Sequence, residues 1–575
     1  MPDHQFRVGE WVVRPDLNAL VAGSDERRIE PKAMDVLVHL ARRKGEVVSK
    51  RELLSTVWDG TRVVDGVLAR CISQLRRALG DDPRAPRFIE TVARRGYRLL
   101  THAAARPDDG VARTLGLAVL PFVNLSGDPG QEHIGEATAE LLSANLAMLR
   151  GLRVTSRTSA LRCRDARATA PEIALQLCVD YVVEGSTLRS PTGDVHVIVK
   201  LVDARADAHV WAREYRRHYD ALLGIAADAA RAIAGELHVD VPSGIRLVTE
   251  SSRVTPRAND AYLRGLYALA KRTPEDMRLA LRLFQEAIER DPKFALGYAG
   301  AGVTSAIMAV YALLPPAEAF AAARSAAQKA IELAPDLGEA YCALAAPQLF
   351  EDWDFAAAER SLRRCVAASP SYALGHLALA DALVAQGRTS EALREISEAA
   401  ALGPMDPGIN MNVGDHLMFA GFLDAAVSQY REAVGMEPRL ARGHARLARA
   451  CAMTGLRAEA LEALERAEAL GDPGARGAAG AFVLARCGRI EEARKHLDVA
   501  ARAPSSAELA QAWAALGDRD EAFRWLDVAL DQRVAYVVFL AVEPALDPLR
   551  DDPRFAARLR RLGVAPAGRP GAIAS

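Results

Sequence analysis

A proline recurs at a nearly constant interval in the second half of this 575-residue chain, and this spacing constrains the fold more than any other feature. The successive gaps are 43, 35, 34, 34 and 35 residues, between Pro292, Pro335, Pro370, Pro404, Pro438 and Pro473. Small residues precede each proline at fixed offsets, as Ala426 and Ala433 precede Pro438. Small residues let paired helices approach closely, and stacked pairs bury a core that no single pair could bury. The spacing therefore predicts an all-α superhelix.

A period of 34 residues is that of the tetratricopeptide repeat, and residues 258–563 resemble an array of such repeats with a C-terminal cap. The first interval is longer because it holds an insertion around residues 313–319. The runs 546–550 and 553–555 resemble the segment that closes such arrays. The resemblance implies a concave face that binds a protein or peptide partner. An array that only dimerises or stabilises the chain is the alternative.

The first hundred residues follow a different pattern, in which short strands surround three helices. Strands are expected at residues 6–8, 11–13, 20–22, 88–92 and 96–100. Helices are expected at residues 31–44, 50–58 and 68–79. Ser49 and Glu52 form a capping-box pattern at the start of the second helix. This order of elements predicts a winged helix.

Positive charge is concentrated in this segment. The whole chain has a net charge of −1, whereas residues 1–100 contain 19 Lys and Arg against 14 Asp and Glu. The third helix carries polar residues opposite its apolar face at the spacing i, i+3, i+4 and i+7, namely Arg70, Ser73, Gln74 and Arg77. Arg can pair with guanine and Gln with adenine through two hydrogen bonds each, so this face is typical of DNA reading. A solvated basic face without a partner is the alternative.

Three ordered motifs in residues 5–100 resemble those of the OmpR/PhoB-type DNA-binding domain. They are EVVSKREL at 46–53, ISQLRRALGDD at 72–82 and TVARRGYR at 91–98. The resemblance implies that the third helix enters the major groove and that the terminal hairpin, the wing, touches the minor groove. It implies eight DNA-facing residues: Arg70, Ser73, Gln74, Arg76, Arg77, Arg94, Arg95 and Arg98. It also implies a loop that meets RNA polymerase, made of Asp59, Gly60, Thr61 and Arg62.

An α/β pattern occupies residues 114–240, between polar stretches at 101–113 and 241–257 that we expect to be linkers. Three runs resemble those of TolB-N-terminal or FlgO-like domains, at residues 118–122, 181–186 and 209–215. This resemblance implies a fold and names no ligand. The winged helix is assigned to residues 1–100. The C-terminal tail at 564–575 is expected to be disordered.

The sequence contains none of the common enzyme motifs and no membrane-spanning run. No Gly-x-Ser-x-Gly, Gly-Lys-Ser/Thr or His-Glu-x-x-His motif occurs, so we predict no catalytic residue, no metal site and no cofactor. No apolar run reaches the roughly 18 residues of a membrane helix. The chain shows no secretory signal and its seven cysteines sit singly, which fits a soluble protein of the reducing cytoplasm.

The expected fold class is therefore multidomain: a winged helix-turn-helix, then an α/β domain, then an all-α tetratricopeptide superhelix. This order resembles that of HilA-like regulators. We expect a cytoplasmic, sequence-specific transcriptional regulator, an activator, that binds promoter DNA and whose later domains receive a signal or partner. One alternative is a scaffold in which the winged helix docks a protein. Another is a regulatory subunit of a nucleotide cyclase. The oligomeric state is left open.

Overall fold

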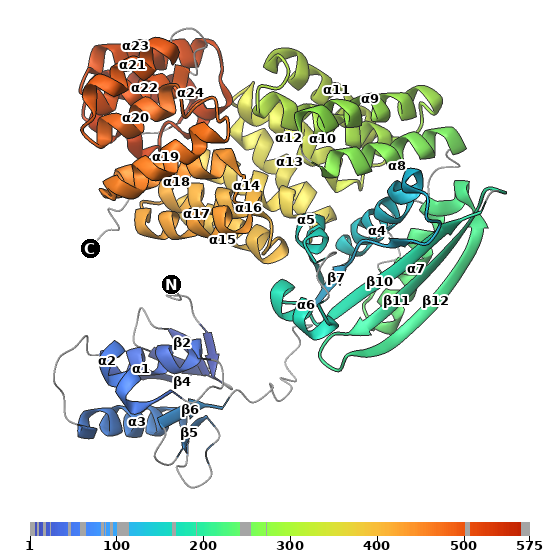
Figure 1. Ribbon diagram of the computed structural model, residues 1–575, viewed down its shortest axis with the longest axis horizontal. Helices are drawn as coiled ribbons and strands as arrows, with labels where there is room; N and C mark the ends of the chain where they lie inside the picture. The colour runs from blue at the N-terminus through green and yellow to red at the C-terminus, as the bar shows by residue number, and fades with distance from the viewer. Residues whose placement is uncertain are drawn as a thin grey trace. The chain divides into compact units, whose positions relative to one another are not determined.

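The computed structural model divides the chain into two compact units, residues 1–112 and 113–575 (Figure 1). The structure describes residues 6–8, 11–14, 19–22, 25–43, 48–57, 65–81, 86, 88–92, 96–100, 114–163, 168–190, 192–241, 255–271, 273–500 and 506–564. No helix among these residues is both long and apolar enough to span a bilayer.

The N-terminal unit is the predicted winged helix. It opens with an antiparallel sheet of four strands paired in chain order, β1 (Phe6–Val8), β2 (Trp11–Arg14), β3 (Ala19–Ala22) and β4 (Asp25–Arg28). Three helices and a hairpin follow: α1 (Pro31–Arg42), α2 (Lys50–Val57), α3 (Asp65–Leu79), β5 (Ile89–Val92) and β6 (Gly96–Leu99). The sequence did not indicate β4, because the segment Asp-Glu-Arg-Arg has no apolar alternation.

A single apolar core holds this unit together. Apolar residues of all three helices meet there, and Leu37, Leu53 and Leu75 are fully buried. Leu20 of β3 packs into the same core and is equally inaccessible. The sheet therefore covers one side of the helices, while the outer face of α3 is left uncovered.

The second unit begins with a mixed sheet in the strand order β12-β11-β10-β7-β9. Its strands are β7 (Leu115–Val119), β8 (Val123–Asn124), β9 (Leu152–Val154), β10 (Tyr181–Arg189), β11 (Asp194–Asp203) and β12 (Ala208–His218). Its helices are α4 (Glu132–Ala147), α5 (Arg157–Leu161), α6 (Ala170–Leu177) and α7 (Leu222–Glu236). Helices α4 and α7 pack on one face of the sheet and α6 on the other. The predicted α/β pattern is confirmed.

The remainder of this unit is the predicted stack of helix pairs (Figure 1). The first helices of the pairs are α8 (Pro256–Ala270), α10 (Ala295–Val310), α12 (Gly338–Phe350), α14 (Ala373–Ala385), α16 (Pro407–Phe419), α18 (Ala441–Thr454), α20 (Ala478–Arg486) and α22 (Ser506–Leu516). The second helices are α9 (Pro274–Arg290), α11 (Pro316–Leu333), α13 (Phe355–Ala368), α15 (Thr389–Leu402), α17 (Leu423–Met436), α19 (Arg457–Ala469), α21 (Ile490–Ala500) and α23 (Arg519–Asp531). Two 3₁₀ helices, η4 (Ala535–Phe539) and η5 (Pro544–Leu549), and α24 (Pro553–Leu562) end the stack.

The α/β part and the helix pairs form one unit, which the sequence did not indicate. Three turns of the stack lie against β9 and α5, and most of the hydrogen bonds there join a side chain to a backbone group. Ser156 N donates to Leu402 O at 2.6 Å, and Met405 N donates to Ser159 Oγ at 3.0 Å. Backbone groups and serines carry no pattern that marks them as interface residues, so this contact had no sequence signal. The predicted domain boundaries themselves stay predictions.

Candidate nucleic-acid interface

Helix α3 has one buried and one open face, as its periodicity predicts. The buried residues are Leu68, Cys71, Ile72, Leu75 and Leu79. Burial raises the pKa of the Cys71 thiol, so this side chain is a neutral core residue. On the open face Arg70, Ser73 and Arg77 are exposed and Gln74 is half-buried. The structure thus brings four of the predicted DNA-facing residues onto one face of one helix.

The N-terminal sheet fixes the C-terminal end of α3. Trp11 Nε1 donates to Leu79 O at 3.2 Å, and Arg27 Nη1 donates to Ala78 O at 3.0 Å. The Arg27 guanidinium also lies 4.5 Å from the centre of the Trp11 ring. Carbonyls in the last turn of a helix lack intrahelical partners, so these two side chains satisfy groups that would otherwise face water. The sheet therefore sets the direction in which α3 points.

Two side chains tie the wing to α3. The buried Asp81 carboxylate accepts from the backbone amides of Phe88 at 3.2 Å and Ile89 at 2.8 Å. Arg76 Nη2 donates to Ile89 O at 2.7 Å and to Thr91 Oγ1 at 2.9 Å. The Arg76 guanidinium is thus engaged within the domain, where it positions the hairpin. Its predicted contact with DNA stays a prediction.

A close backbone approach pins the wing to the start of α2. Val48 N donates to Tyr97 O at 2.9 Å, and Tyr97 N donates to Val48 O at 3.0 Å. Next to this bridge Gly96 has a φ of +149°, and a Cβ added there would lie 1.9 Å from Val48 O. No side chain fits at that distance, so glycine is required at this position.

The cap of α2 is linked to α1. Ser49 Oγ accepts from Glu52 N at 3.1 Å, which is one half of the predicted capping box. The Glu52 carboxylate accepts from Arg43 Nη2 at 2.6 Å and lies 3.3 Å from His39 Nε2. The Arg43 bond, followed by the His39 contact, lowers the pKa of Glu52. The reciprocal bond from Ser49 N to Glu52 stays a prediction.

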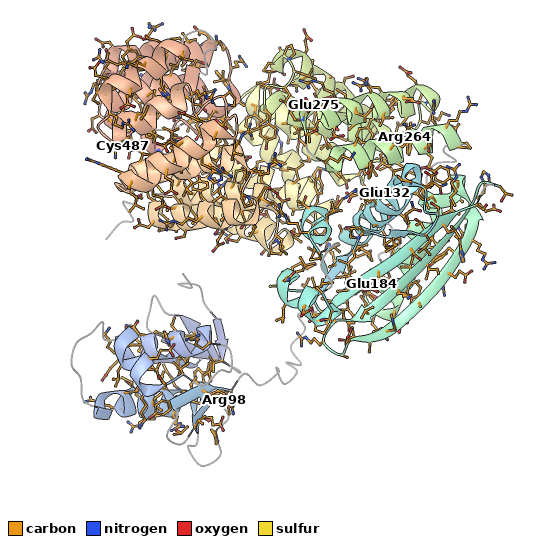
Figure 2. The ribbon with its side chains drawn as sticks, in the orientation of Figure 1. Arg98, Glu132, Glu184, Arg264, Glu275 and Cys487 are labelled. Carbon is orange, nitrogen blue, oxygen red and sulfur yellow. The ribbon has the colours of Figure 1, made fainter. Side chains whose placement is uncertain are left out.

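The remaining predicted residues differ in their surroundings. Arg98 projects from β6 (Figure 2), and its Nε donates to Glu90 Oε2 at 2.8 Å. Arg70 Nη2 lies 3.6 Å from Glu30 Oε1, with both side chains largely exposed. The Arg77 side chain is exposed and forms no hydrogen bond or ion pair with a side chain in the described part of the winged helix. Several predicted residues lie outside the described part of the chain: Arg94, Arg95, Asp59, Gly60, Thr61 and Arg62.

The residues that position this interface were missed at the level of sequence. Trp11 and Arg27 bind backbone groups 68 and 51 residues away, and no local pattern marks such partners. Asp81 binds amides only seven and eight residues further on, across a turn whose course the sequence did not indicate. Gly96 had one available signal, since a glycine at the start of a hairpin strand often marks close backbone approach. No group of three His, Cys, Asp or Glu side chains in the described ranges could hold a metal ion.

Two family models match the chain. Residues 24–99 match the model described as "Transcriptional regulatory protein, C terminal", and residues 349–411 match the model "Tetratricopeptide repeat". The first range contains α1 to α3 and the wing, and the second lies within the helix pairs. Both matches agree with the domains that the structure contains.

The chain is similar to several proteins of known name. Transcriptional regulator HilA of Salmonella typhimurium is 28% identical over 57% of this chain and 58% of its own length. Transcriptional activator CadC of Escherichia coli is 41% identical over 16% of this chain and 19% of its own. Putative adenylate cyclase 3 of Rhizobium meliloti is 27% identical over 35% of this chain and 34% of its own. The chain thus spans less than two thirds of each relative.

A solved structure of the E. coli CadC DNA-binding domain is 39% identical over 17% of this chain and 94% of its own, with a TM-score of 0.16. The predicted resemblance to TolB-N-terminal or FlgO-like domains stays a prediction. The family models, the relatives and the observed elements agree on the two ends of the molecule. The chain carries an OmpR/PhoB-type transcriptional regulator domain at its N-terminus and tetratricopeptide repeats toward its C-terminus.

Proposed function

We propose that this protein is a sequence-specific DNA-binding transcriptional regulator. The observation that carries the proposal is the open face of α3, where Arg70, Ser73 and Arg77 are exposed on a domain that matches a transcriptional regulator family. The matched relatives include proteins named transcriptional regulator and transcriptional activator. A helix of this kind fits the major groove of B-DNA, which is wide enough to admit it.

In this proposal the residues of the interface have distinct roles. Arg77 and Gln74 contact base edges, because their side chains form paired hydrogen bonds with guanine and adenine. Arg70 and Ser73 contact phosphate or sugar beside them. Arg76 is a positioning residue, since its bonds to Ile89 and Thr91 set the wing against α3. Arg94 and Arg95 are proposed as DNA contacts of the wing, and Arg98 as a weaker contact, because its guanidinium already bonds Glu90.

The wider role is also a proposal. The loop of Asp59, Gly60, Thr61 and Arg62 would meet RNA polymerase, as the family resemblance implies, and the protein would activate transcription. We propose a cytoplasmic location, because the relatives named transcriptional regulators come from bacteria, whose DNA lies in the cytoplasm. We further propose that the chain is a regulator and not itself an enzyme, on the strength of the relatives named transcriptional regulators. The partner of the repeats would be a protein or peptide.

The test is capture of genomic DNA fragments by the full-length protein, followed by sequencing. The expected result is enrichment of one motif over random fragments at moderate salt. The matched control is Arg77→Ala, which should enrich the same motif less strongly while leaving weak binding to random DNA in place.

Enrichment of no motif by the wild-type protein would contradict the proposal. In that case the winged helix would be a protein-docking module and the molecule a scaffold. Capture of a motif that is unchanged in Arg77→Ala would keep the regulator role and remove Arg77 from base reading.

A further inference from the structure

The chain's own C-terminal segment covers part of the inner face of the repeats. The first helices of successive pairs contact one another from α10 to α22, so together they line one side of the stack. This side is the concave one in a tetratricopeptide superhelix. The segment 534–549, which contains η4 and η5, lies against α12, α14 and α22 of this side. We call it the inner segment.

Aromatic rings seat the inner segment. The Phe539 ring stacks on Phe419 of α16, with centroids 5.1 Å apart and planes 22° apart. The Tyr536 ring meets Phe539 edge-on at 5.6 Å and lies 6.4 Å from Phe419. Val538 between them is fully buried. Two aromatic residues three positions apart thus fill one site on α16.

A buried carboxylate forms the second anchor. Glu543 is 1% exposed and forms an ion pair with Arg449 of α18. Tyr536 Oη donates to Glu543 Oε2 at 2.8 Å and accepts from Arg449 Nη1 at 3.2 Å. Burial by itself would lower the pKa of Arg449, but Glu543 and Tyr536 outweigh it and raise that pKa. Arg449 is therefore a charged donor, and charge-assisted bonds of this kind are among the stronger ones in proteins.

The segment is held at both ends. At its start the Arg533 guanidinium lies 4.6 Å from the centre of the Trp353 ring. After it, α24 is held to α23 by the pair Arg554–Asp520 at 2.7 Å. Between these anchors the segment has no α-helix of its own and belongs to no helix pair. Short 3₁₀ helices make fewer and poorer internal bonds than α-helices, so the segment depends on the groove for its order.

From these contacts we infer that the inner face of α12 to α18 is a peptide-binding groove, that the inner segment is its resident occupant, and that a partner enters by displacing it. The partner chemistry follows from the occupant: a peptide with two aromatic residues three positions apart and a carboxylate four positions further on. The rings would stack at Phe419 and the carboxylate would pair with Arg449. The inner segment thus blocks the partner site until it is displaced.

The test combines hydrogen–deuterium exchange with peptide binding, both on the full-length protein. Glu543→Gln removes the charge that Arg449 pairs with and keeps the size of the side chain. We expect amide exchange in residues 535–549 to rise at least tenfold in this variant, with α10 and α11 unchanged. A fluorescent peptide of residues 533–549 should then bind the variant at least tenfold more tightly than the wild-type protein. The control is Glu521→Gln, which removes an exposed pair with Arg524 on α23.

Unchanged exchange in residues 535–549, or equal peptide binding by Glu543→Gln and the wild-type protein, would overturn the inference. If Glu543→Gln proves unfolded by circular dichroism, Tyr536→Phe is used instead, because it removes one hydroxyl and keeps the ring that packs on Phe539. Amide exchange in residues 535–549 and binding of the peptide are then measured on Tyr536→Phe, with the same expected results. Neither involves DNA, so failure here leaves the proposed function standing.

Discussion

The open face of α3 and the inner face of the repeats use the same side chain in opposite ways. Arg77 on α3 is exposed and pairs with no side chain in the described part of the winged helix, whereas Arg449 on α18 is buried against Glu543 and Tyr536. A guanidinium that folding leaves in water is available to a phosphate or a base. One that folding buries must be paired within the chain. Charge alone therefore does not identify a binding site in this molecule. An arginine is more available to a ligand where its guanidinium has no partner within the folded chain.

The energetic consequence of the two placements also differs. A buried charge whose partner is removed loses far more than an exposed one, because water cannot replace the missing partner. An exposed arginine can be replaced with little effect on folding, so any loss appears in ligand binding. Stability should therefore respond at the repeats, and DNA affinity should respond at α3.

The largest expected effect is on the stability of the repeats. Replacing Arg449 with Met leaves the Glu543 carboxylate buried without its ion-pair partner, and we expect the free energy of unfolding to fall by about 3 to 5 kcal/mol. Chemical denaturation followed by circular dichroism measures the loss. The matched control is Arg524→Met, which breaks an exposed pair with Glu521 and should change stability by less than about 1 kcal/mol. Equal losses in both variants would break the comparison.

Within the winged helix, backbone crowding should matter more than charge. The Cβ of Gly96→Ala would clash with Val48 O, so we expect the free energy of unfolding of this unit to fall by about 2 to 3 kcal/mol. Hydrogen exchange of the Tyr97 amide reports the loss directly. Gly80→Ala is the control, since Gly80 has a φ of +70° with open space around it and should lose about 1 kcal/mol. A Gly96→Ala protein as stable as Gly80→Ala would argue against the close approach.

At the open face of α3 a substitution should lower DNA affinity and leave the stability of the fold nearly unchanged. Arg77→Ala is expected to weaken binding to the captured motif by about 1 to 3 kcal/mol and to leave the melting temperature nearly unchanged. Fluorescence anisotropy with motif and random duplexes measures the change in affinity, and a melting curve measures the change in stability. A fall in stability without a fall in affinity would reverse the comparison.

The smallest effect is expected at Arg98, because its guanidinium already bonds Glu90. Arg98→Ala should change both stability and DNA affinity by less than about 1 kcal/mol, as is typical of partly exposed ion pairs. The same anisotropy assay applies. A loss as large as that of Arg77→Ala would mean that Arg98 leaves Glu90 for DNA.

Local periodicity predicted most of the fold. The proline spacing indicated the helix pairs, and the i, i+3, i+4, i+7 pattern of α3 separated its buried face from the face of Arg77. What could not be predicted depends on contacts between distant positions. The clash that requires Gly96 arises from Val48, and the burial of Glu543 depends on Arg449 of an earlier helix pair. The apolar run before Glu543 matches a strand or a helix equally well, so its place in the groove had no local signal.

The central claim is that the open face of α3 reads DNA sequence, and one ratio tests it most directly. This is the affinity of the full-length protein for its captured motif divided by its affinity for random duplex, measured at one salt concentration for wild type and Arg77→Ala. We expect this ratio to fall by about tenfold or more in Arg77→Ala, through weaker binding to the motif alone. A ratio near one for the wild-type protein, or an unchanged ratio in Arg77→Ala, would contradict it.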